Sequence, residues 1–256
     1  MNRPPLLSIA IIAQDEAPRL AELLSALTWA DEIVVVDGGS RDATPSIALQ
    51  HGCRLVSRPF DNFASQRNFA MQACRGKWVL SLDADEMPTA ALIDELLAVL
   101  ATPQFDAYRV PIRSRIFGRR IRFSGTQDDC PIRLVRRGGG RWSGAVHESL
   151  VVAGCVGRLR GHLSHRSLDD LETFLAKMHR YTRLAATQRV AAREAPQRHE
   201  RWYRPVREAA RRLIWKQGWL DGPTGWAFCF LSGLSEWVLA DQHRRLWPAN
   251  PRHAKH

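Results

Sequence analysis

The feature that most constrains the fold is a regular alternation of strand-like and helix-like segments over residues 6–100. Short β-rich runs occupy residues 7–12, 32–36, 54–56 and 78–82. In the segment between the first two runs, leucines recur at the spacing of one helical face, at Leu20, Leu23, Leu24 and Leu27. Such alternation predicts a parallel sheet with helices on both faces. In open sheets of this kind, ligands bind beyond the carboxyl ends of the strands.

The remaining segments extend this prediction to the whole chain. Further helices are expected after Gly38-Gly39-Ser40, at about 62–74 and at 88–100. From 105 to 165 short β-like runs predict a smaller mixed sheet that completes the site. A helix is expected from about 170 to 187, then a basic connector at 188–204 and two further helical stretches. We therefore expect a catalytic domain at 1–165, with halves 1–100 and 101–165, and a helical C-terminal extension at 166–256.

Charge is distributed unevenly along the chain. The net charge is +11, but residues 1–100 carry eight Lys and Arg against thirteen Asp and Glu, so the remainder is +16. The two parts therefore meet different partners. Arginine forks suit phosphate groups, although an arginine-rich codon bias explains the same composition. Five scattered cysteines without a C-x-x-C pair indicate neither a disulfide framework nor a zinc site, and they fit a reducing compartment.

A cluster of acids follows the apolar run at 78–82, in the segment KWVLSLDADEMP. Asp83 and Asp85 lie on the same side of an extended segment, because side chains alternate with period two. Two carboxylates on one side suit Mg²⁺ or Mn²⁺, which keeps open positions for substrate phosphates. The alternative is that these acids favour the N-terminal dipole of the helix expected near Pro88. Glu86 is expected to be a helix-entry residue or a support for the other two acids.

A second acidic strand end is Asp37, which closes the run at 32–36 in IVVVDGGSRDAT. Gly38 lets the backbone approach a ligand closely, and Asp37 can accept hydrogen bonds from a base or ribose. The spacing is not that of the G-x-G-x-x-G dinucleotide fingerprint, so a NAD site is not indicated. Ser40 or Asp42 can also serve in ordinary helix capping. Because Asp37 and Asp83 end neighbouring strands, we expect them to face one crevice.

Several segments resemble the inverting family 2 glycosyltransferases of GT-A fold: SIAIIAQDEAPRLAELLSAL, EIVVVDGGSRDAT, ASQRNFAMQACRGKWVLSLDADE and RWSGAVHE. Within that family the resemblance is to the bacterial lipopolysaccharide-core subgroup typified by the inner-core β-1,4-glucosyltransferase. It continues in order through YTRLAA at 181–186 and GWLDGPTGWAF at 218–228, and so covers most of the chain. The resemblance implies an α/β, Rossmann-like nucleotide-sugar-binding fold with a mostly parallel central sheet, flanking helices and a C-terminal helical extension.

The resemblance also implies roles in binding a donor such as UDP-glucose or a related UDP-hexose. Asp37 would lie near the nucleobase, with Gly38 and Ser40 in the same substrate-binding turn. Arg67 would lie near the nucleotide. Asp83 and Asp85 would then be the Asp-x-Asp motif that holds the ribose and the metal-bound diphosphate.

Inverting transfer needs a general base that deprotonates the acceptor hydroxyl, and a carboxylate is the usual choice. Glu148 matches the family's His-Glu position and is the leading candidate, with His147 orienting an acceptor or a phosphate. Asp129 in TQDDCPIRL is the rival candidate. His147 can equally be a satisfied core histidine, and the sequence does not separate the two carboxylates.

Two basic regions bear on the acceptor and on the membrane. The arginines between 109 and 141 either grip an anionic acceptor, such as a lipid A-core saccharide, or form a solvated basic face. Six tryptophans after residue 200 are interleaved with Arg and Lys, a combination that favours a membrane interface. The alternative for this region is helices packed on the main domain or on a second subunit. We expect peripheral contact with the cytoplasmic face of the inner membrane.

The expected function is that of a glycosyltransferase acting on a lipopolysaccharide-core glycolipid, and three alternatives to it follow from the sequence. The acceptor could instead be another surface polysaccharide or a protein. A basic nucleic-acid-binding protein would explain the pI near 10.3, but not the acids at strand ends, and no aromatic RNA-binding signature is present, so no specific nucleic-acid partner is expected. A nucleotidyltransferase would be expected to carry a Gly- and Lys-rich N-terminal loop, which is missing.

Overall fold

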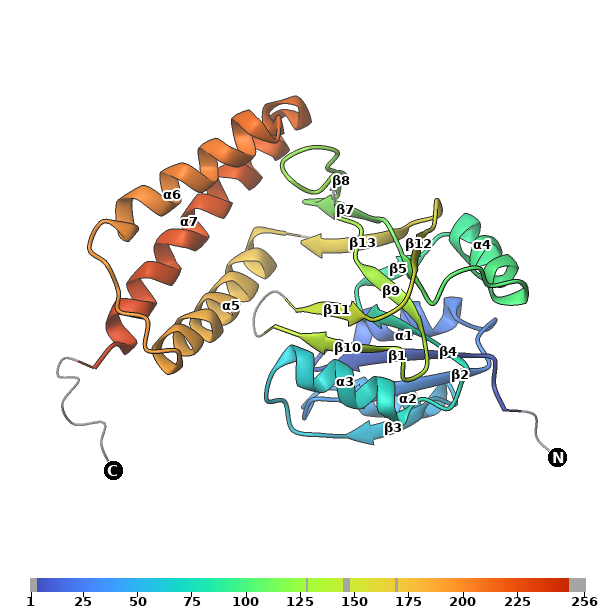
Figure 1. Cartoon of the computed structure of the whole chain (residues 1–256). Helices are drawn as coiled ribbons and strands as arrows, with labels where there is room; N and C mark the ends of the chain where they lie inside the picture. Colours follow the sequence, from blue (N-terminus) through green and yellow to red (C-terminus); the bar gives the residue numbers. More distant parts are fainter. Residues whose placement is uncertain (1–3, 128, 145–147, 169, 249–256) are drawn as a thin grey trace. The chain divides into compact units, whose positions relative to one another are not determined.

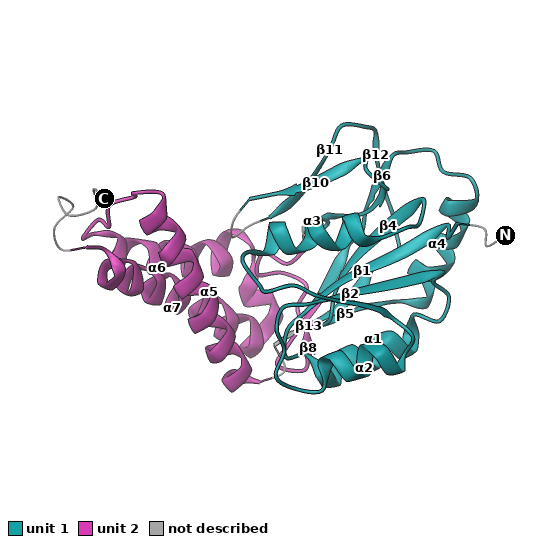
Figure 2. Cartoon of the chain, turned by 90° about the horizontal axis from the view of Figure 1, so that it is seen from below, with its two compact units in different colours: residues 1–113, 128–165 teal, residues 114–127, 166–256 magenta. Residues whose placement is uncertain are grey.

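The computed structural model describes residues 4–127, 129–144, 148–168 and 170–248. The chain forms two compact units (Figures 1 and 2). Unit 1 comprises Met1–Arg113 and Asp128–His165, and unit 2 comprises Ser114–Gln127 and Arg166–His256. Unit 1 thus ends at His165, and the short segment Ser114–Gln127 belongs with the C-terminal helices.

Unit 1 is built on a seven-stranded sheet with the order β12-β6-β9-β4-β1-β2-β3. Its strands are β1 (Leu7–Ala13), β2 (Glu32–Asp37), β3 (Arg54–Ser57), β4 (Trp78–Asp83), β6 (Ala107–Arg109), β9 (Ile132–Arg136) and β12 (Val156–Arg158). β9 runs antiparallel to β4 and β6, and the other pairings are parallel. The predicted α/β fold with a mostly parallel sheet is therefore confirmed.

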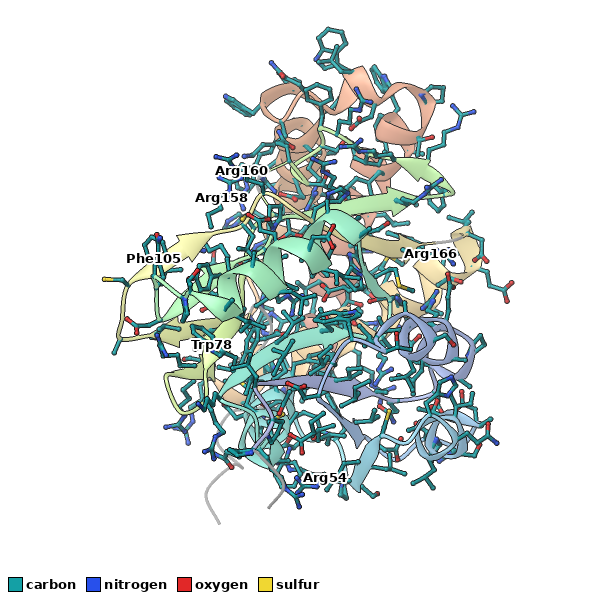
Figure 3. The ribbon with its side chains drawn as sticks, turned by 90° about the vertical axis from the view of Figure 1, so that its right-hand side faces the viewer. Arg54, Trp78, Phe105, Arg158, Arg160 and Arg166 are labelled. Atoms are coloured by element: carbon teal, nitrogen blue, oxygen red, sulfur yellow. The ribbon has the colours of Figure 1, made fainter. Side chains whose placement is uncertain are left out.

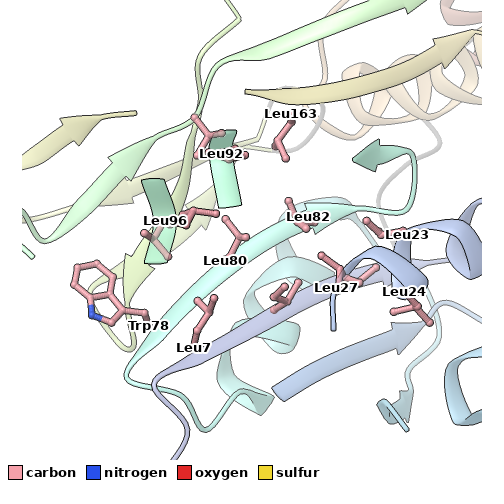
Figure 4. Close-up of a cluster of buried hydrophobic side chains, with 14 of the residues drawn as sticks. Leu7, Leu23, Leu24, Leu27, Trp78, Leu80, Leu82, Leu92, Leu96 and Leu163 are labelled. Atoms are coloured by element: carbon pink, nitrogen blue, oxygen red, sulfur yellow. The ribbon is translucent and has the colours of Figure 1, made fainter. Parts of the chain in front are cut away.

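Side-chain alternation along the strands sorts the core into two layers. Leu7, Ile9 and Ile11 of β1 pack with α1 (Ala17–Ala26), α2 (Thr44–Gln50) and α4 (Ala90–Ala101), and Figure 4 shows the leucines of this layer. Ala10 and Val79 face the other way and pack with α3 (Phe63–Ala73). Side chains alternate between the two faces of the sheet, and helices cover both faces. Successive residues of each strand are therefore buried, and the strands are nearly continuous apolar runs in the sequence.

The smaller mixed sheet expected at 105–165 is formed only in part, since Ile112–Ile116, Arg119–Arg120 and Leu163–Leu168 join a separate four-stranded sheet. β6, β9 and β12 instead extend the main sheet. The hairpin of β10 (Gly140–Ser143) and β11 (Ser149–Val152) packs on the α3 layer through Trp142 and Leu150. The helix predicted to begin at Pro88 begins at Ala90, because 86–88 form a short strand, β5 (Glu86–Pro88), that pairs with β13 (Leu163–Leu168).

Unit 2 is mainly helical. Its elements are the β7 (Ile112–Ile116) and β8 (Arg119–Arg120) hairpin, α5 (Leu171–Ala191), α6 (Glu200–Ala210) with a following π-helical turn η1 (Arg211–Trp215), the 3₁₀ turn η2 (Gly218–Asp221) and α7 (Gly222–Leu246). The connector predicted at 188–204 is shorter than expected. α5 continues to Ala191, because no helix breaker occurs before Pro196. α6 then starts at Glu200.

The GWLDGPTG segment is a packing motif within unit 2 rather than a plain linker. The Asp221 carboxylate accepts hydrogen bonds from the backbone N–H groups of Arg122 and Phe123, at 2.9 and 3.0 Å, and from the Ser124 hydroxyl. A Cβ atom at Gly225 would lie 2.1 Å from the Gly218 carbonyl oxygen, so no side chain fits there. None of the helices in the described part of the chain combines the length and apolar character needed to cross a membrane.

Candidate active site

Three strand ends bring the predicted donor-site residues to one edge of the sheet. In the parallel register, Ala13 at the end of β1 pairs with Asp37, and Ile12 pairs with Asp83. Asp37 and Asp83 therefore flank the carboxyl end of β1. They do not end directly neighbouring strands, as the sequence analysis expected, because β1 lies between β2 and β4. This edge is where ligands bind in open α/β sheets.

Asp37 closes the turn that follows β2. Its carboxylate is buried and accepts hydrogen bonds from the backbone N–H groups of Gly39 and Ser40, at 3.1 and 3.2 Å. Gly38 donates its N–H to the Ala13 carbonyl at 2.8 Å, which holds the turn against the end of β1. The Ser40 hydroxyl accepts from the Asp15 N–H at 2.9 Å. Ser40 thus joins the loops after β1 and β2 and does not cap its own helix.

Asp42 has a structural role in the same pair of loops. Its carboxylate accepts hydrogen bonds from the N–H groups of Ala17 at 3.0 Å and Thr44 at 2.9 Å. Slight burial opposes ionisation, but these hydrogen bonds lower the pKa of Asp42. Asp42 therefore binds the first N–H group of α1 and of α2, although the N-cap residues of these helices are Glu16 and Ala43.

Asp83 is held by two arginines. Arg67 Nη2 lies 2.7 Å from Asp83 Oδ1, and Arg133 Nη2 lies 3.3 Å from Asp83 Oδ2. Burial opposes ionisation, but the two guanidinium groups outweigh it and hold the pKa of Asp83 below its usual range. Arg67 is itself 6% exposed, and its buried Nη1 has no hydrogen-bond partner in the described part of the chain. Arg67 thus has donor capacity for an anionic or polar ligand.

Glu86 and Arg133 form a buried pair next to Asp83. Glu86 is 2% exposed, accepts a hydrogen bond from the Asp83 N–H at 3.0 Å and contacts Arg133 Nη2 directly. Burial is the main cause that raises the pKa of Glu86, against the charge of Arg133. Glu86 therefore supports Asp83, and it is not a helix-entry residue because α4 begins four positions later.

Sequence reasoning did not assign Arg133 to this role. It placed Arg133 among the arginines of a basic face, yet Arg133 is 6% exposed and lies in β9 between buried apolar residues. An arginine at a buried position of a predicted strand is the signal that points to an internal counter-ion, because charged side chains are buried only when paired.

Asp85 pairs with a histidine that the sequence analysis did not name. His165 Nε2 lies 3.3 Å from Asp85 Oδ1. The pairing of β5 with β13 places His165 opposite Glu86. Burial opposes protonation of His165, but the hydrogen bond to Asp85 and the nearby carboxylates raise its pKa. The sequence did not indicate that Glu86 pairs with His165, because β5 is only three residues long and the two residues lie far apart in the chain.

Glu148 reaches the same cluster. Its Oε1 lies 3.2 Å from Arg67 Nε, and its side chain is 14% exposed. Arg67 therefore contacts both Asp83 and the leading candidate for the base. Asp129, the rival, is exposed and makes no hydrogen bond or ion pair with its side chain among the described residues. His147 lies outside the described residues.

The family resemblance implies a divalent cation, for which Asp83 and Asp85 are the predicted ligands. Within residues 4–127, 129–144, 148–168 and 170–248, no group of three or more His, Cys, Asp or Glu side chains could by itself hold a metal ion. Asp83 already contacts two guanidinium groups. Asp85, with a 13% exposed side chain, fits a cation that takes its other ligands from phosphate and water.

The structure separates the arginines that the sequence analysis grouped as one basic region. Arg136 lies 4.7 Å from the ring centroid of the buried Trp78 and pairs with Asp106 at 3.3 Å. Figure 3 labels Trp78. Arg109 donates to the Cys130 carbonyl at 3.3 Å. Arg137 and Arg141 are exposed, and their side chains make no ion pair or hydrogen bond among the described residues. Only some of these arginines are therefore free to meet a ligand.

Known proteins resemble the chain in sequence over most of its length. The family model described as Glycosyl transferase family 2 matches residues 8–153. A relative in Rhizobium meliloti (strain 1021), the lipopolysaccharide core biosynthesis glycosyltransferase LpsC, is 30% identical over an alignment of 244 residues, which covers 88% of this chain and 90% of that protein.

Solved structures are similar at a lower level. S. aureus TarS 1-349 in complex with UDP-GlcNAc is 13% identical with a TM-score of 0.48, covering 93% of this chain and 89% of that one. Glucosyl-3-phosphoglycerate synthase from Mycobacterium tuberculosis, crystallised with Mn²⁺, UDP and glucosyl-3-phosphoglycerate, is 17% identical with a TM-score of 0.47, covering 73% and 79%.

The assignment rests on the family model, which spans more than half of the chain, and on the relative in Rhizobium, which is matched over nearly its whole length. Both agree with the α/β architecture of unit 1 and with acids gathered at the carboxyl ends of β2 and β4. The chain belongs to glycosyl transferase family 2.

Proposed function

We propose that the protein transfers a hexose, with glucose as the leading candidate, from a UDP-sugar to an anionic glycolipid of the lipopolysaccharide core, with inversion at the anomeric carbon. The observation that carries the proposal is the position of Arg67, which contacts both Asp83 at the donor edge and Glu148. One buried side chain thus joins the predicted donor-binding acid to the predicted base. The 30% identical relative is a lipopolysaccharide core biosynthesis glycosyltransferase, which supports the acceptor class.

The residues of unit 1 divide the work as follows. The turn at Asp37, Gly38 and Ser40 holds the nucleoside, since its glycines let a ligand approach the backbone. The buried Nη1 of Arg67 donates to the diphosphate or ribose. Asp83, fixed by Arg67 and Arg133, accepts from the ribose.

A divalent cation, Mg²⁺ or Mn²⁺, would be held by Asp85, with Asp83 as the second carboxylate of the predicted pair. When bound, it would neutralise the charge that develops on the leaving diphosphate.

Glu148 is the proposed general base. Its carboxylate is oriented by Arg67 at 3.2 Å and lies on the chain immediately before β11. A base must reach the proton that it removes, and an attacking hydroxyl placed beside Glu148 meets this condition. Proton removal by Glu148 raises the nucleophilicity of the acceptor oxygen as the sugar carbon becomes oxocarbenium-like.

Unit 2 is proposed to hold the enzyme at the cytoplasmic face of the inner membrane. Several exposed side chains of α6 and η1 are large and apolar, with Trp202 at 71%, Val206 at 70% and Trp215 at 78% exposure. Unit 2 also has twenty-one Lys and Arg residues against nine Asp and Glu residues, a net charge of +12. Amphipathic aromatic rings and cations together favour an anionic lipid surface.

Product analysis tests the proposed reaction. The protein is incubated with UDP-glucose, UDP-galactose or UDP-GlcNAc, a divalent cation and truncated lipopolysaccharide. The expected products are UDP and a glycolipid whose new linkage is β, as inversion of an α-linked donor requires. Release of free diphosphate would indicate nucleotidyl transfer instead. Transfer to a protein or to another polysaccharide, but not to lipopolysaccharide, would replace the acceptor class.

A further inference from the structure

A polar groove runs along α3 in unit 1, separate from the donor edge. It has a volume of about 910 Å³ and is bounded by α3 on one side and by the segment 137–144 on the other. Neither Asp37, Asp83, Asp85, Arg67 nor Glu148 lines it. Ligand pockets of proteins commonly fall between about 300 and 1,000 Å³, so the groove has room for a short oligosaccharide.

The lining of the groove is basic and rich in amides. It contains no carboxylate, while Arg137 and Arg141 enter it from the β9–β10 side. Both side chains are exposed and lack an ion pair among the described residues. Arg58 also lines the groove, but Asp61 neutralises it at 2.9 Å. Two uncompensated positive charges therefore favour an anionic ligand.

The α3 side supplies groups that suit sugar hydroxyls. Asn62, Asn68 and Gln72 line the groove, and amide groups both donate and accept hydrogen bonds. The Asn62 oxygen already accepts from the Ser65 N–H, and the Asn68 amide is bonded at both ends within unit 1. Gln72 is exposed and its side chain makes no hydrogen bond within the described part of the chain, so its amide is available. Two arginines beside the available Gln72 amide favour a charged saccharide over a bare anion, since a bare anion uses only the arginines.

The wall of the groove is connected to the proposed catalytic residues through Trp142. Asn68 accepts a hydrogen bond from the Trp142 N–H at 2.8 Å and donates to its carbonyl at 2.9 Å, which fixes the hairpin on α3. The guanidinium carbon of Arg67 lies 4.9 Å from the centroid of the Trp142 ring. Since Arg67 also contacts Glu148, the side chains of Trp142 and Arg67 connect the groove to the proposed base.

We propose that this groove binds an anionic saccharide, with Arg137 and Arg141 as its charge-recognising residues. The inference rests on the proposed function: the groove holds the part of the acceptor that carries a phosphate or carboxylate, while the reacting hydroxyl lies beside Glu148. The groove determines which acceptor is used and takes no part in bond formation.

The test uses the full-length protein and two matched double variants. Arg137→Gln/Arg141→Gln removes the two free charges of the groove. Arg158→Gln/Arg160→Gln removes two exposed arginines elsewhere in unit 1, labelled in Figure 3, and changes the net charge equally. Glucose 6-phosphate is titrated into each ¹⁵N-labelled protein, with glucose and inorganic phosphate as comparison ligands, and amide shifts of 62–72 and 138–143 are followed by NMR.

Glucose 6-phosphate is expected to shift these amides in the wild type and in Arg158→Gln/Arg160→Gln, and to bind about tenfold or more weakly to Arg137→Gln/Arg141→Gln, since that variant loses both charge-assisted contacts. Absence of shifts, or equal loss in both variants, would overturn the proposal. Inorganic phosphate binding as tightly as the sugar phosphate would overturn the saccharide assignment. UDP is titrated into the same samples as a separate measurement. Failure to bind UDP would count against the proposed function, whereas failure to bind glucose 6-phosphate would count against the groove.

Discussion

Arg67 Nε lies 3.2 Å from Glu148 Oε1, and the same guanidinium group lies 2.7 Å from Asp83 through Nη2. One buried arginine of α3 therefore contacts both Asp83, at the sheet edge proposed to bind the donor, and the proposed base. Lysine cannot replace this arrangement, because a single ammonium group lacks the planar fork that reaches two carboxylates in fixed directions. The Glu148 carboxylate thus contacts Arg67, while the Asp129 side chain makes no hydrogen bond or ion pair among the described residues.

Replacing the proposed base, Glu148, is expected to abolish most sugar transfer while leaving UDP binding intact. Glu148→Gln keeps a hydrogen-bond acceptor beside Arg67 but cannot accept a proton, so transfer is expected to fall about 10²–10⁴-fold, the usual contribution of a general base. UDP affinity, measured by calorimetry, is expected to stay close to that of the wild type. Asp129→Asn is the control and should retain transfer. Full transfer by Glu148→Gln together with loss in Asp129→Asn would assign the base to Asp129.

The Glu86–Arg133 pair predicts a large stability effect. Arg133→Met leaves Glu86 buried without its cation and is expected to lower the free energy of unfolding by about 3–5 kcal/mol. Glu86→Gln/Arg133→Met should be less destabilised than Arg133→Met, since the uncompensated charge is gone. Urea unfolding followed by circular dichroism measures both. Arg136→Gln, which changes a half-exposed arginine of the same strand, serves as control with an expected loss of about 1 kcal/mol or less. Equal losses for Arg133→Met and Arg136→Gln would contradict the internal counter-ion role.

Glu208 in unit 2 gives a pH-dependent contribution. Its carboxylate contacts Arg211 at 2.8 Å and Arg212 at 2.7 Å. The hydrogen bond with Arg211, opposed by partial burial and aided by Arg212, lowers the pKa of Glu208 to about 2. A depressed pKa stabilises the folded state above the unfolded-state pKa, about 4.3, and this contribution is lost as the pH falls toward the folded value.

The matching variant is Glu208→Gln. At pH 7 it is expected to be less stable than the wild type by about 1 kcal/mol. The difference should shrink as the pH is lowered from 4.5 toward 2, because the wild-type carboxylate becomes protonated. Thermal unfolding at several pH values measures this. A difference that stays constant down to pH 2 would show that Glu208 acts through packing and not through its charge.

The apolar surface of α6 and η1 predicts binding to anionic lipid. Trp202→Ala/Trp215→Ala should bind vesicles containing phosphatidylglycerol about tenfold or more weakly, because each tryptophan loses its interfacial contact. Leu49→Ala/Leu97→Ala changes two exposed apolar residues of unit 1 and is the control. Co-sedimentation measures binding, and light scattering measures oligomeric state. Binding unaffected by the tryptophan variant, or self-association that the variant abolishes, would contradict lipid as the occupant.

The sequence predicts local structure well where the periodicity is long. The strand runs of β1, β2 and β4 and the leucine face of α1 follow directly from residue spacing, as does the position of Asp37 and Asp83 at the same edge. Short strands are not predictable in this way: β5 has three residues, and its pairing with β13 decides that Glu86 is internal and that His165 meets Asp85.

Long-range partners within the candidate site were also not predictable. Arg133 is one of several arginines between 133 and 141, and only the fold brings it within 3.3 Å of Asp83, 50 positions away in the chain. The contact of Arg67 with Glu148 joins residues 81 positions apart. Motif resemblance supplied the list of candidates, but burial and register determine which of them are paired with one another.

The most direct test of the central claim is calorimetric titration of UDP-glucose and UDP with and without Mn²⁺. The wild type is expected to bind UDP more tightly with Mn²⁺, and Asp85→Asn should lose about tenfold or more of that Mn²⁺-dependent affinity. Asp94→Asn, at an exposed position of α4, is the control with the same change in charge. UDP affinity that neither chelation of the metal nor Asp85→Asn alters would contradict the role assigned to Asp85. Absence of UDP binding by the wild type would contradict the account of the donor site as a whole.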